Sequence, residues 1–187
     1  MRTNKSLNSM PNYRRANAGG ATYFFTVVTQ RRRPILMRAC VLDALRTAFR
    51  TVRQAKPFKI DAVVVLPDHI HTLWTLPVGD ANYGARWGMI KRQVSKVVLE
   101  EEQIHVSDSM RARKEHGVWQ RRFWEHLIRD ENDYARHMDY IHCNPVKHGY
   151  VERPADWVHS SFHRCVEQGI YPLDWAAGGD IEGGFGE

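Results

Sequence analysis

Two short β-rich runs stand almost back to back in the sequence, and this arrangement most constrains what the chain can fold into. Residues 59–66 (KIDAVVVL) and 69–76 (HIHTLWTL) are rich in β-branched, aromatic and aliphatic side chains. Only Pro67 and Asp68 separate them. Two strands joined by so short a turn pair antiparallel, because parallel pairing needs a long crossover. The sequence therefore predicts a β-hairpin, and the other elements must be arranged around it.

The remaining segments alternate between strand-like and helix-like patterns. Residues 21–29 (ATYFFTVVT) and 118–128 (VWQRRFWEHLI) are predicted strands. Apolar residues recur at helical spacing over residues 41–54 and 87–98, which predicts two amphipathic helices. The resulting order, β-α-β-β-α-β, is typical of an α+β, ferredoxin-like split βαβ fold, in which an antiparallel sheet carries helices on one face.

A further helix is expected after the last predicted strand. Asp130 is a suitable N-cap, and Asp133 follows three residues later, as in a capping box. Pro145 disfavours helical geometry in the residue before it. We therefore expect this C-terminal helix to end at about Asn144, with Gly149 as a stop signal.

The length of the chain, 187 residues, suits one domain with a substantial core. We expect that domain over residues 13–165, followed over residues 166–187 by an acidic, glycine-rich tail that is mobile after Trp175. No aliphatic run is long enough to span a bilayer, and residues 1–15 carry no secretory signal. The three cysteines are an odd number, widely spaced and never in a C-x-x-C pair, which argues against a disulfide scaffold and a cysteine zinc site. These observations predict a cytoplasmic protein that does not engage the membrane.

The charge of the chain is unevenly distributed. There are 27 Lys and Arg residues against 21 Asp and Glu residues, and none of the basic ones follows Arg164. A basic body of this kind suggests a polyanionic partner, with nucleic acid as the first candidate. Surplus arginine on an ordinary protein surface would give the same count. The acidic residues after Arg164 could fold over the basic surface and compete with that partner.

His69 and His71 are the first candidates for chemistry. They are two residues apart in a predicted strand, so both imidazoles project from one face while Ile70 projects from the other. Two neutral imidazoles this close can share one divalent cation. A His-x-His triplet can also arise by chance in a chain with 10 histidines, and the pair is therefore a candidate metal site only.

Tyr140 is the second candidate, in the predicted C-terminal helix. Asn144 lies four residues later and His137 three residues earlier, so all three share one face. This stripe offers a phenol as nucleophile, an amide as a third metal ligand and an imidazole as a base. The alternative interpretation of Tyr140 is a half-buried aromatic residue that only packs, and that of Asn144 is a helix-ending residue.

Taken together, these residues resemble a known family. Residues 63–74 (VVVLPDHIHTLW) resemble the HUH motif of the HUH endonuclease superfamily, and residues 133–149 (DYARHMDYIHCNPVKHG) resemble the tyrosine helix of its single-tyrosine transposases. Across residues 13–175 the chain is most similar to the REP-associated tyrosine transposases, an IS200-like group that acts at repetitive extragenic palindromes of bacterial genomes. The other stretches that carry the resemblance are YRR (13–15), GGATYFFT (19–26), WQRRFWEH (119–126), WVHSSFHR (157–164) and GIYPLDW (169–175).

The resemblance implies a role for each candidate residue. The family binds Mg²⁺ or Mn²⁺ through its two HUH histidines, which correspond to His69 and His71, and its nucleophile corresponds to Tyr140. Asn144 occupies the position of a third ligand, where insertion-sequence relatives usually have the longer glutamine. A free phenol has a pKa of about 10, so Tyr140 needs activation, which either the metal or His137 as a base could supply. The implied reaction cleaves and rejoins single-stranded DNA through a covalent 5′-phosphotyrosine.

The implied substrate is single-stranded DNA folded into an imperfect hairpin, the REP palindrome. This subfamily is associated with monomers rather than dimers. Basic residues that flank the first strand, or lie on the polar side of the second helix, are candidate DNA contacts. They are Arg14, Arg15, Arg31, Arg32, Arg33, Arg92 and Lys96, and each could instead be a solvated surface residue.

Three other functions compete with this interpretation. A non-catalytic DNA-binding protein could retain the fold to bind palindromes, but the loss of a histidine or of the tyrosine would be its signature. A replication initiator or relaxase would use the same HUH chemistry, but such enzymes are usually larger. A structural zinc site fits least well, because the sequence has no second ligand pair at a suitable spacing.

Overall fold

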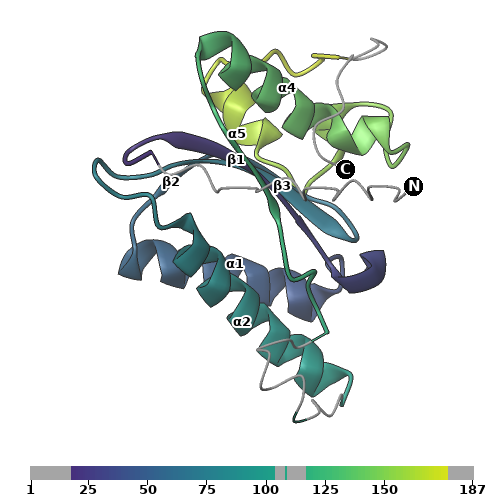
Figure 1. Cartoon of the computed structure of the whole chain (residues 1–187). Coiled ribbons are helices and arrows are strands. Elements are labelled where there is room, and N and C mark those ends of the chain that lie inside the picture. Colours follow the sequence, from purple (N-terminus) through teal and green to yellow (C-terminus); the bar gives the residue numbers. More distant parts are fainter. Residues whose placement is uncertain (1–17, 104–107, 109–116, 177–187) are drawn as a thin grey trace, which may run out of the picture.

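A four-stranded antiparallel sheet forms the centre of the molecule (Figure 1). The computed structural model describes residues 18–103, 108 and 117–176 of the chain. The strands lie in the order β2-β3-β1-β4, and every neighbouring pair is antiparallel. Their bounds are Thr22–Val28 for β1, Lys59–Val65 for β2, His69–Thr75 for β3 and Trp124–Leu127 for β4.

Helices cover both faces of the sheet (Figure 1). α1 (Ala39–Ala55) and α2 (Tyr83–Glu101) pack against one face, and α4 (Glu131–Lys147) and the short α5 (Phe162–Glu167) against the other. Two 3-10 helices, η1 (Gln30–Arg32) and η2 (Pro154–Asp156), lie in connections. The predicted α+β, ferredoxin-like fold with an additional C-terminal helix is confirmed.

The two faces of the sheet carry separate hydrophobic cores. Alternate residues of β1 enter different cores: Tyr23 and Phe25 pack towards α1 and α2, whereas Phe24 packs towards α4 and α5. Because helices cover both faces, β1 is buried almost along its whole length. This explains why its sequence shows a continuous apolar run rather than alternation.

The fourth strand is shorter than the sequence predicts. Residues 118–128 read as one strand, but β4 comprises only Trp124–Leu127. Trp119 makes an isolated bridge to Thr29, and between this bridge and β4 the chain leaves the sheet. Phe123 then packs its ring against Trp87 of α2, so tertiary packing overrides the strand propensity of this segment.

The predicted end of the C-terminal helix at Asn144 is wrong by three residues. α4 continues through Pro145 to Lys147. Beyond it, the Gly149 N–H donates to Val146 O and the Tyr150 N–H to Pro145 O, a Schellman motif that satisfies the terminal carbonyl groups. Gly149 has a φ of +69°, as the predicted stop signal requires.

The start of α4 agrees with the sequence, whereas the domain boundary expected at residue 165 stays a prediction. The Asp130 carboxylate accepts a hydrogen bond of 2.7 Å from the Asp133 N–H, so Asp130 is the N-cap. Residues up to Trp175 pack on the domain, where the Tyr171 hydroxyl donates to Asp139 Oδ1 at 2.6 Å. The remainder of the predicted tail, residues 177–187, lies outside the described residues. Among the described residues, no helix combines the length and the hydropathy needed to cross a bilayer.

Candidate active site

His69 and His71 lie at the start of β3, on the face of the sheet that α4 covers. Their ring centroids are 4.7 Å apart, and both side chains are buried. The alternation of β3 places both imidazoles on this face and Ile70 in the core beneath α1 and α2. The structure therefore brings the two histidines of the sequence motif together at one point.

Each imidazole is oriented through its Nδ1 atom. His69 Nδ1 lies 2.6 Å from Asp68 Oδ1, and His71 Nδ1 lies 2.9 Å from the hydroxyl of Thr26, its register partner in β1. Nε2 is therefore the nitrogen that each ring can present to a metal. His69 Nε2 is buried and has no hydrogen-bond partner among the described residues. Neither Asp68 nor Thr26 was predicted as part of the site, although Asp68 directly precedes the motif; Thr26 can be identified only from the strand register.

Burial and pairing set the charges at His69 and Asp68. Burial lowers the pKa of His69 below its ordinary value, although the Asp68 carboxylate acts in the opposite direction. Burial alone would raise the pKa of Asp68, but its contacts with His69 and Arg32 hold that pKa below its ordinary value. Near neutral pH, His69 is therefore neutral and Asp68 is ionised, which is the state that a histidine ligand and its supporting carboxylate require.

α4 presents one face to this histidine pair. The ring of Tyr140 lies 5.1 Å from that of His71, and only 2% of Tyr140 is exposed. Asn144, one turn later, is fully buried. One further turn along, the ring of His148 lies 5.3 Å from that of His69. Sequence analysis missed His148, although its spacing of four from Asn144 places it on the stripe of Tyr140.

Two further neighbours flank Tyr140. Phe24 of β1 packs its ring against both Tyr140 and His71, at centroid distances of 6.0 and 5.5 Å. The Lys147 ammonium nitrogen lies 5.1 Å from the centre of the Tyr140 ring. A cation at this distance is attracted to the negative face of the ring, so Lys147 helps to hold the Tyr140 ring in place.

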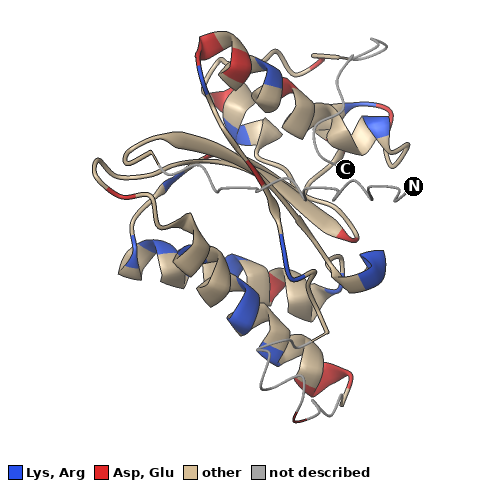
Figure 2. Ribbon diagram, viewed as in Figure 1, with Lys and Arg blue, Asp and Glu red and all other residues tan. Residues whose placement is uncertain are grey.

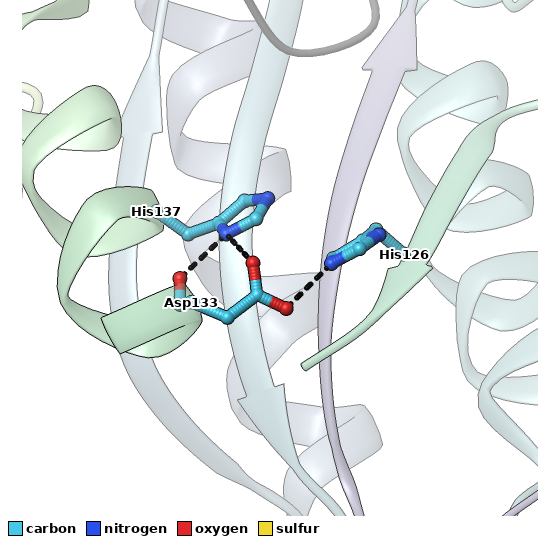
Figure 3. A group of neighbouring side chains, drawn as sticks. All are labelled: His126, Asp133 and His137. Carbon is cyan, nitrogen blue, oxygen red and sulfur yellow. Dashed lines mark hydrogen bonds and ion pairs between the residues drawn. The ribbon is translucent and has the colours of Figure 1, made fainter. Parts of the chain in front are cut away.

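His137 belongs to a second cluster, which Figure 3 shows together with its partners Asp133 and His126. Asp133 Oδ2 accepts from His126 Nε2 at 2.8 Å and from the backbone N–H of Arg129 at 3.1 Å. His137 Nδ1 donates to the Asp133 carbonyl oxygen at 2.7 Å and lies 3.3 Å from Asp133 Oδ1. The cluster therefore ties β4 to the first turns of α4.

The donor atoms of His126, Asp133 and His137 lie within 4.8 Å of one another, which is close enough to consider a metal. However, Arg129 Nε lies 3.2 Å from the Asp133 carboxylate and an Arg136 guanidinium nitrogen 3.8 Å from it. Two guanidinium groups already more than neutralise the single negative charge of the Asp133 carboxylate. A divalent cation would increase the net positive charge further. We interpret the cluster as a polar clasp that fixes the start of α4.

The predicted DNA contacts fall into three groups. Arg31 of η1, and Arg92 and Lys96 of α2, are exposed and lie on the side of the sheet where Figure 2 shows most of the blue ribbon. Arg32 and Arg33 form ion pairs with other segments, Arg32 with Asp68 and Arg33 with Glu102, whereas Lys96 has Glu100 of its own helix at 3.9 Å. The other two, Arg14 and Arg15, lie outside the described residues.

Comparisons with known proteins point in one direction. A family model described as "Transposase IS200 like" matches residues 18–144. A putative REP-associated tyrosine transposase of Haemophilus influenzae is 45% identical over 173 residues, which are 92% of this chain and 97% of the relative. The REP-associated tyrosine transposase of Escherichia coli is 44% identical over 172 residues, 92% of this chain and 93% of the relative. A solved structure of a REP-associated tyrosine transposase bound to a REP hairpin has a TM-score of 0.76 and 43% identity, and the match covers 93% of this chain and 94% of that one.

Proposed function

The chain belongs to the IS200-like transposase family, as one of its REP-associated tyrosine transposases, and on this premise we propose that it cleaves and rejoins single-stranded DNA at REP hairpins. In this proposal Tyr140 is the nucleophile, and His69, His71 and Asn144 hold Mg²⁺ or Mn²⁺. The observation that carries the proposal is the Tyr140 ring, which lies 5.1 Å from that of His71 on the face of α4 turned towards the histidine pair.

The residues present fit a divalent cation. His69 Nε2 is buried and has no hydrogen-bond partner within the described part of the chain, and Asp68 fixes the opposite nitrogen of the same ring. Imidazole nitrogens suit Mn²⁺ at least as well as Mg²⁺, and the Asn144 amide offers an oxygen. A bound cation would act as a Lewis acid on the non-bridging oxygens of the scissile phosphate.

Tyr140 provides the covalent step. Its oxygen attacks the phosphorus, the bond between phosphorus and the 3′ oxygen breaks, and the 5′ phosphate stays on the tyrosine. The reverse attack by a 3′-hydroxyl rejoins the strands without any nucleotide cofactor. His137 stays our candidate to accept the phenol proton, because burial lowers its pKa and leaves it neutral near pH 7.

The substrate class follows from the same premise. The solved relative is bound to a REP hairpin, and we propose that the present chain binds a hairpin of the same class. We also propose that it acts in the cytoplasm and as a monomer. Arg31, Arg92 and Lys96 are the exposed candidates for phosphate contacts. This assignment treats Arg32 and Arg33 as supports of their loop, because they pair with carboxylates of other segments, Asp68 and Glu102, whereas the Glu100 partner of Lys96 lies on the same helix.

A covalent adduct tests the chemistry. Labelled single-stranded REP hairpins would be incubated with the protein and Mn²⁺ or Mg²⁺, and adducts that survive denaturation would be counted. We expect adducts for the wild type and for Tyr134→Phe, a control that removes another phenol from α4. We expect none for Tyr140→Phe, for His69→Ala, or for the wild type with a chelator. Tight binding by the wild type without any adduct would favour a non-catalytic palindrome-binding protein instead.

A further inference from the structure

A row of aromatic rings leads away from His69. The ring of His148 lies 5.3 Å from that of His69, and the ring of Tyr150 lies 5.8 Å from that of His148 with an interplanar angle of 26°. Trp157 continues the row, 5.5 Å from Tyr150 and again at 26°. His159 follows edge-on at 6.0 Å. We call His148, Tyr150, Trp157 and His159 the aromatic row.

The aromatic row is assembled from separate parts of the chain. His148 caps α4, Tyr150 follows the Gly149 turn, and the last two rings come after η2. No helical or strand periodicity brings these rings into line. Tyr150 is also 45% exposed, so a ligand in solvent can reach this part of the row.

The far end of the aromatic row reaches a pocket between α1 and the edge of β2. The pocket has a volume of about 270 Å³, and its walls include Leu45, Phe49 and Val63. Arg46 and His159 also line it, and the Arg46 side chain is 63% exposed and pairs with the exposed Asp43 one turn earlier on α1, at 2.9 Å. Arg50 and Arg53 follow at helical spacing on α1 and, with Phe49, line an adjoining hollow. An apolar recess flanked by exposed cations favours an occupant that is apolar in part and anionic in part.

Single-stranded DNA combines these two properties. Its unpaired bases expose flat faces that stack on aromatic side chains, and its phosphates are attracted to arginine. A duplex hides the same faces inside the helix, and so it cannot use the row. We propose that the aromatic row binds the single-stranded DNA next to the scissile phosphate, with bases stacked on its rings and the strand directed towards Arg46. The proposal rests on the proposed function, because it takes His69 to mark the place of cleavage.

The members of the row differ in their suitability for a test. Trp157 donates from Nε1 to Val65 O at 3.0 Å and is partly buried, so its removal would also disturb β2. Tyr150 is more exposed, and its backbone N–H closes the Schellman motif whatever side chain is present. Tyr150→Ala therefore removes a ring with little effect on the fold, and Tyr150→Phe is the matched control that keeps the ring.

The test measures binding rather than cleavage. A fluorescent REP hairpin with single-stranded extensions at both ends of its stem would be compared with the same hairpin cut flush, by anisotropy and in the presence of a chelator. We expect the wild type to bind the extended hairpin more tightly. Tyr150→Ala should weaken binding of the extended hairpin about fivefold or more and leave the flush hairpin unchanged. Tyr150→Phe should bind both like the wild type.

Three outcomes would overturn the proposal. One is a wild type that binds the two hairpins equally, and another is a Tyr150→Ala variant that keeps the full preference for the extended one. The third is an equal loss for both hairpins, because it would indicate damage to the fold or to a duplex contact. Failure of the proposed chemistry is a separate result: the adduct would be missing while the preference for the extended hairpin, and its dependence on the Tyr150 ring, persisted.

Discussion

At the scale of single residues, the two histidines of the candidate site are held by unlike partners. The Asp68 carboxylate holds His69, whereas the Thr26 hydroxyl holds His71. A carboxylate behind an imidazole fixes its orientation and raises its basicity as a ligand, and a hydroxyl group does so less. The proposed metal affinity therefore depends on Asp68 more than on Thr26.

The charge of Asp68 should control metal affinity. Asp68→Asn keeps an acceptor oxygen beside His69 but removes the negative charge. We expect the Mn²⁺ concentration that gives half-maximal adduct to rise about 10- to 100-fold, with full adduct restored by excess Mn²⁺. Asp174→Asn, which removes an exposed carboxylate from the segment after α5, is the control. An unchanged Mn²⁺ dependence in Asp68→Asn would refute this role.

The charge of Asp133 should control stability in acid. Burial alone would raise the pKa of Asp133, but its contacts with His126 and Arg129 hold it well below the ordinary value. As the pH falls through about 4, the unfolded chain therefore takes up this proton before the folded one does, and the stability that Asp133 contributes above that pH is lost. In urea unfolding, the wild type should lose more stability than Asp133→Asn between pH 6 and pH 2.5. At pH 7 the variant should be about 1–3 kcal/mol less stable than the wild type. Parallel stability curves for the two proteins would contradict the assignment.

The sequence predicts only those parts of this site whose residues are close together in the chain. A separation of two in a strand and of four in a helix suffices to group His69 with His71 and Tyr140 with Asn144. The clasp of His126 with Asp133 depends on where β4 ends and on how α4 packs, and sequence spacing alone gives neither. The link between Tyr150 and Trp157 is also tertiary, because η2 separates them in the chain.

At the scale of elements, α4 is the part on which the candidate site depends most. Its first turn is fixed by the Asp130 cap and by the clasp around Asp133. Its last turn is fixed by the Schellman motif at Gly149, which lets the helix continue past Pro145. A helix held at both ends keeps its inner face, including Tyr140, at a constant position over β3.

Two glycines should respond to alanine in opposite directions. A Cβ atom on either Gly149 or Gly88 would meet no atom within 4 Å, so packing does not distinguish them. Gly149 has a φ of +69°, and alanine there should cost about 1–2 kcal/mol. Gly88 lies on the exposed side of α2, where alanine should stabilise the protein by about 0.5–1 kcal/mol. Urea unfolding of the two variants measures both changes, and a shift in the same direction for both would contradict this account.

Local propensity alone does not predict where the helices and strands of this protein begin and end. α1 and α2 were predictable because amphipathic periodicity covers most of their length. β4 is shorter than its propensity suggests because the Phe123 ring packs on α2, and α4 is longer because hydrogen bonds after Pro145 satisfy its last carbonyls. Both differences arise from contacts with other residues rather than from the segments themselves.

At the scale of the whole molecule, positive charge gathers on one side of the sheet. Figure 2 shows Lys and Arg at η1 and along α1 and α2, whereas the first turn of α4 is marked by acidic residues. The proposed site lies on the α4 side, next to the end of β3 that adjoins η1. A substrate bound there can reach the basic side around this end of the sheet, past Asp68.

The exposed cations of this side should set the salt dependence of DNA binding. In Arg31→Ala and Arg92→Ala, hairpin affinity should fall, and the slope of its logarithm against the logarithm of salt concentration should decrease by about one for each phosphate that the protein no longer neutralises. Lys59→Ala, at the far end of β2, should leave the slope unchanged. Titrations at several salt concentrations measure this, and an unaltered slope in both arginine variants would exclude Arg31 and Arg92 as phosphate contacts.

The strand order also determines when β1 can pair with its neighbours during synthesis of the chain. β1 is translated first and ends at Val28, but its two neighbours in the sheet end only at Thr75 and Leu127. At the usual synthesis rate of about 5–20 residues per second, β3 is complete about 2–10 s after β1, and β4 is complete about 5–20 s after β1. During that time its apolar sequence, TYFFTVV, has no partner strand of its own. The nascent chain on the ribosome is therefore the form of this protein most exposed to misassembly.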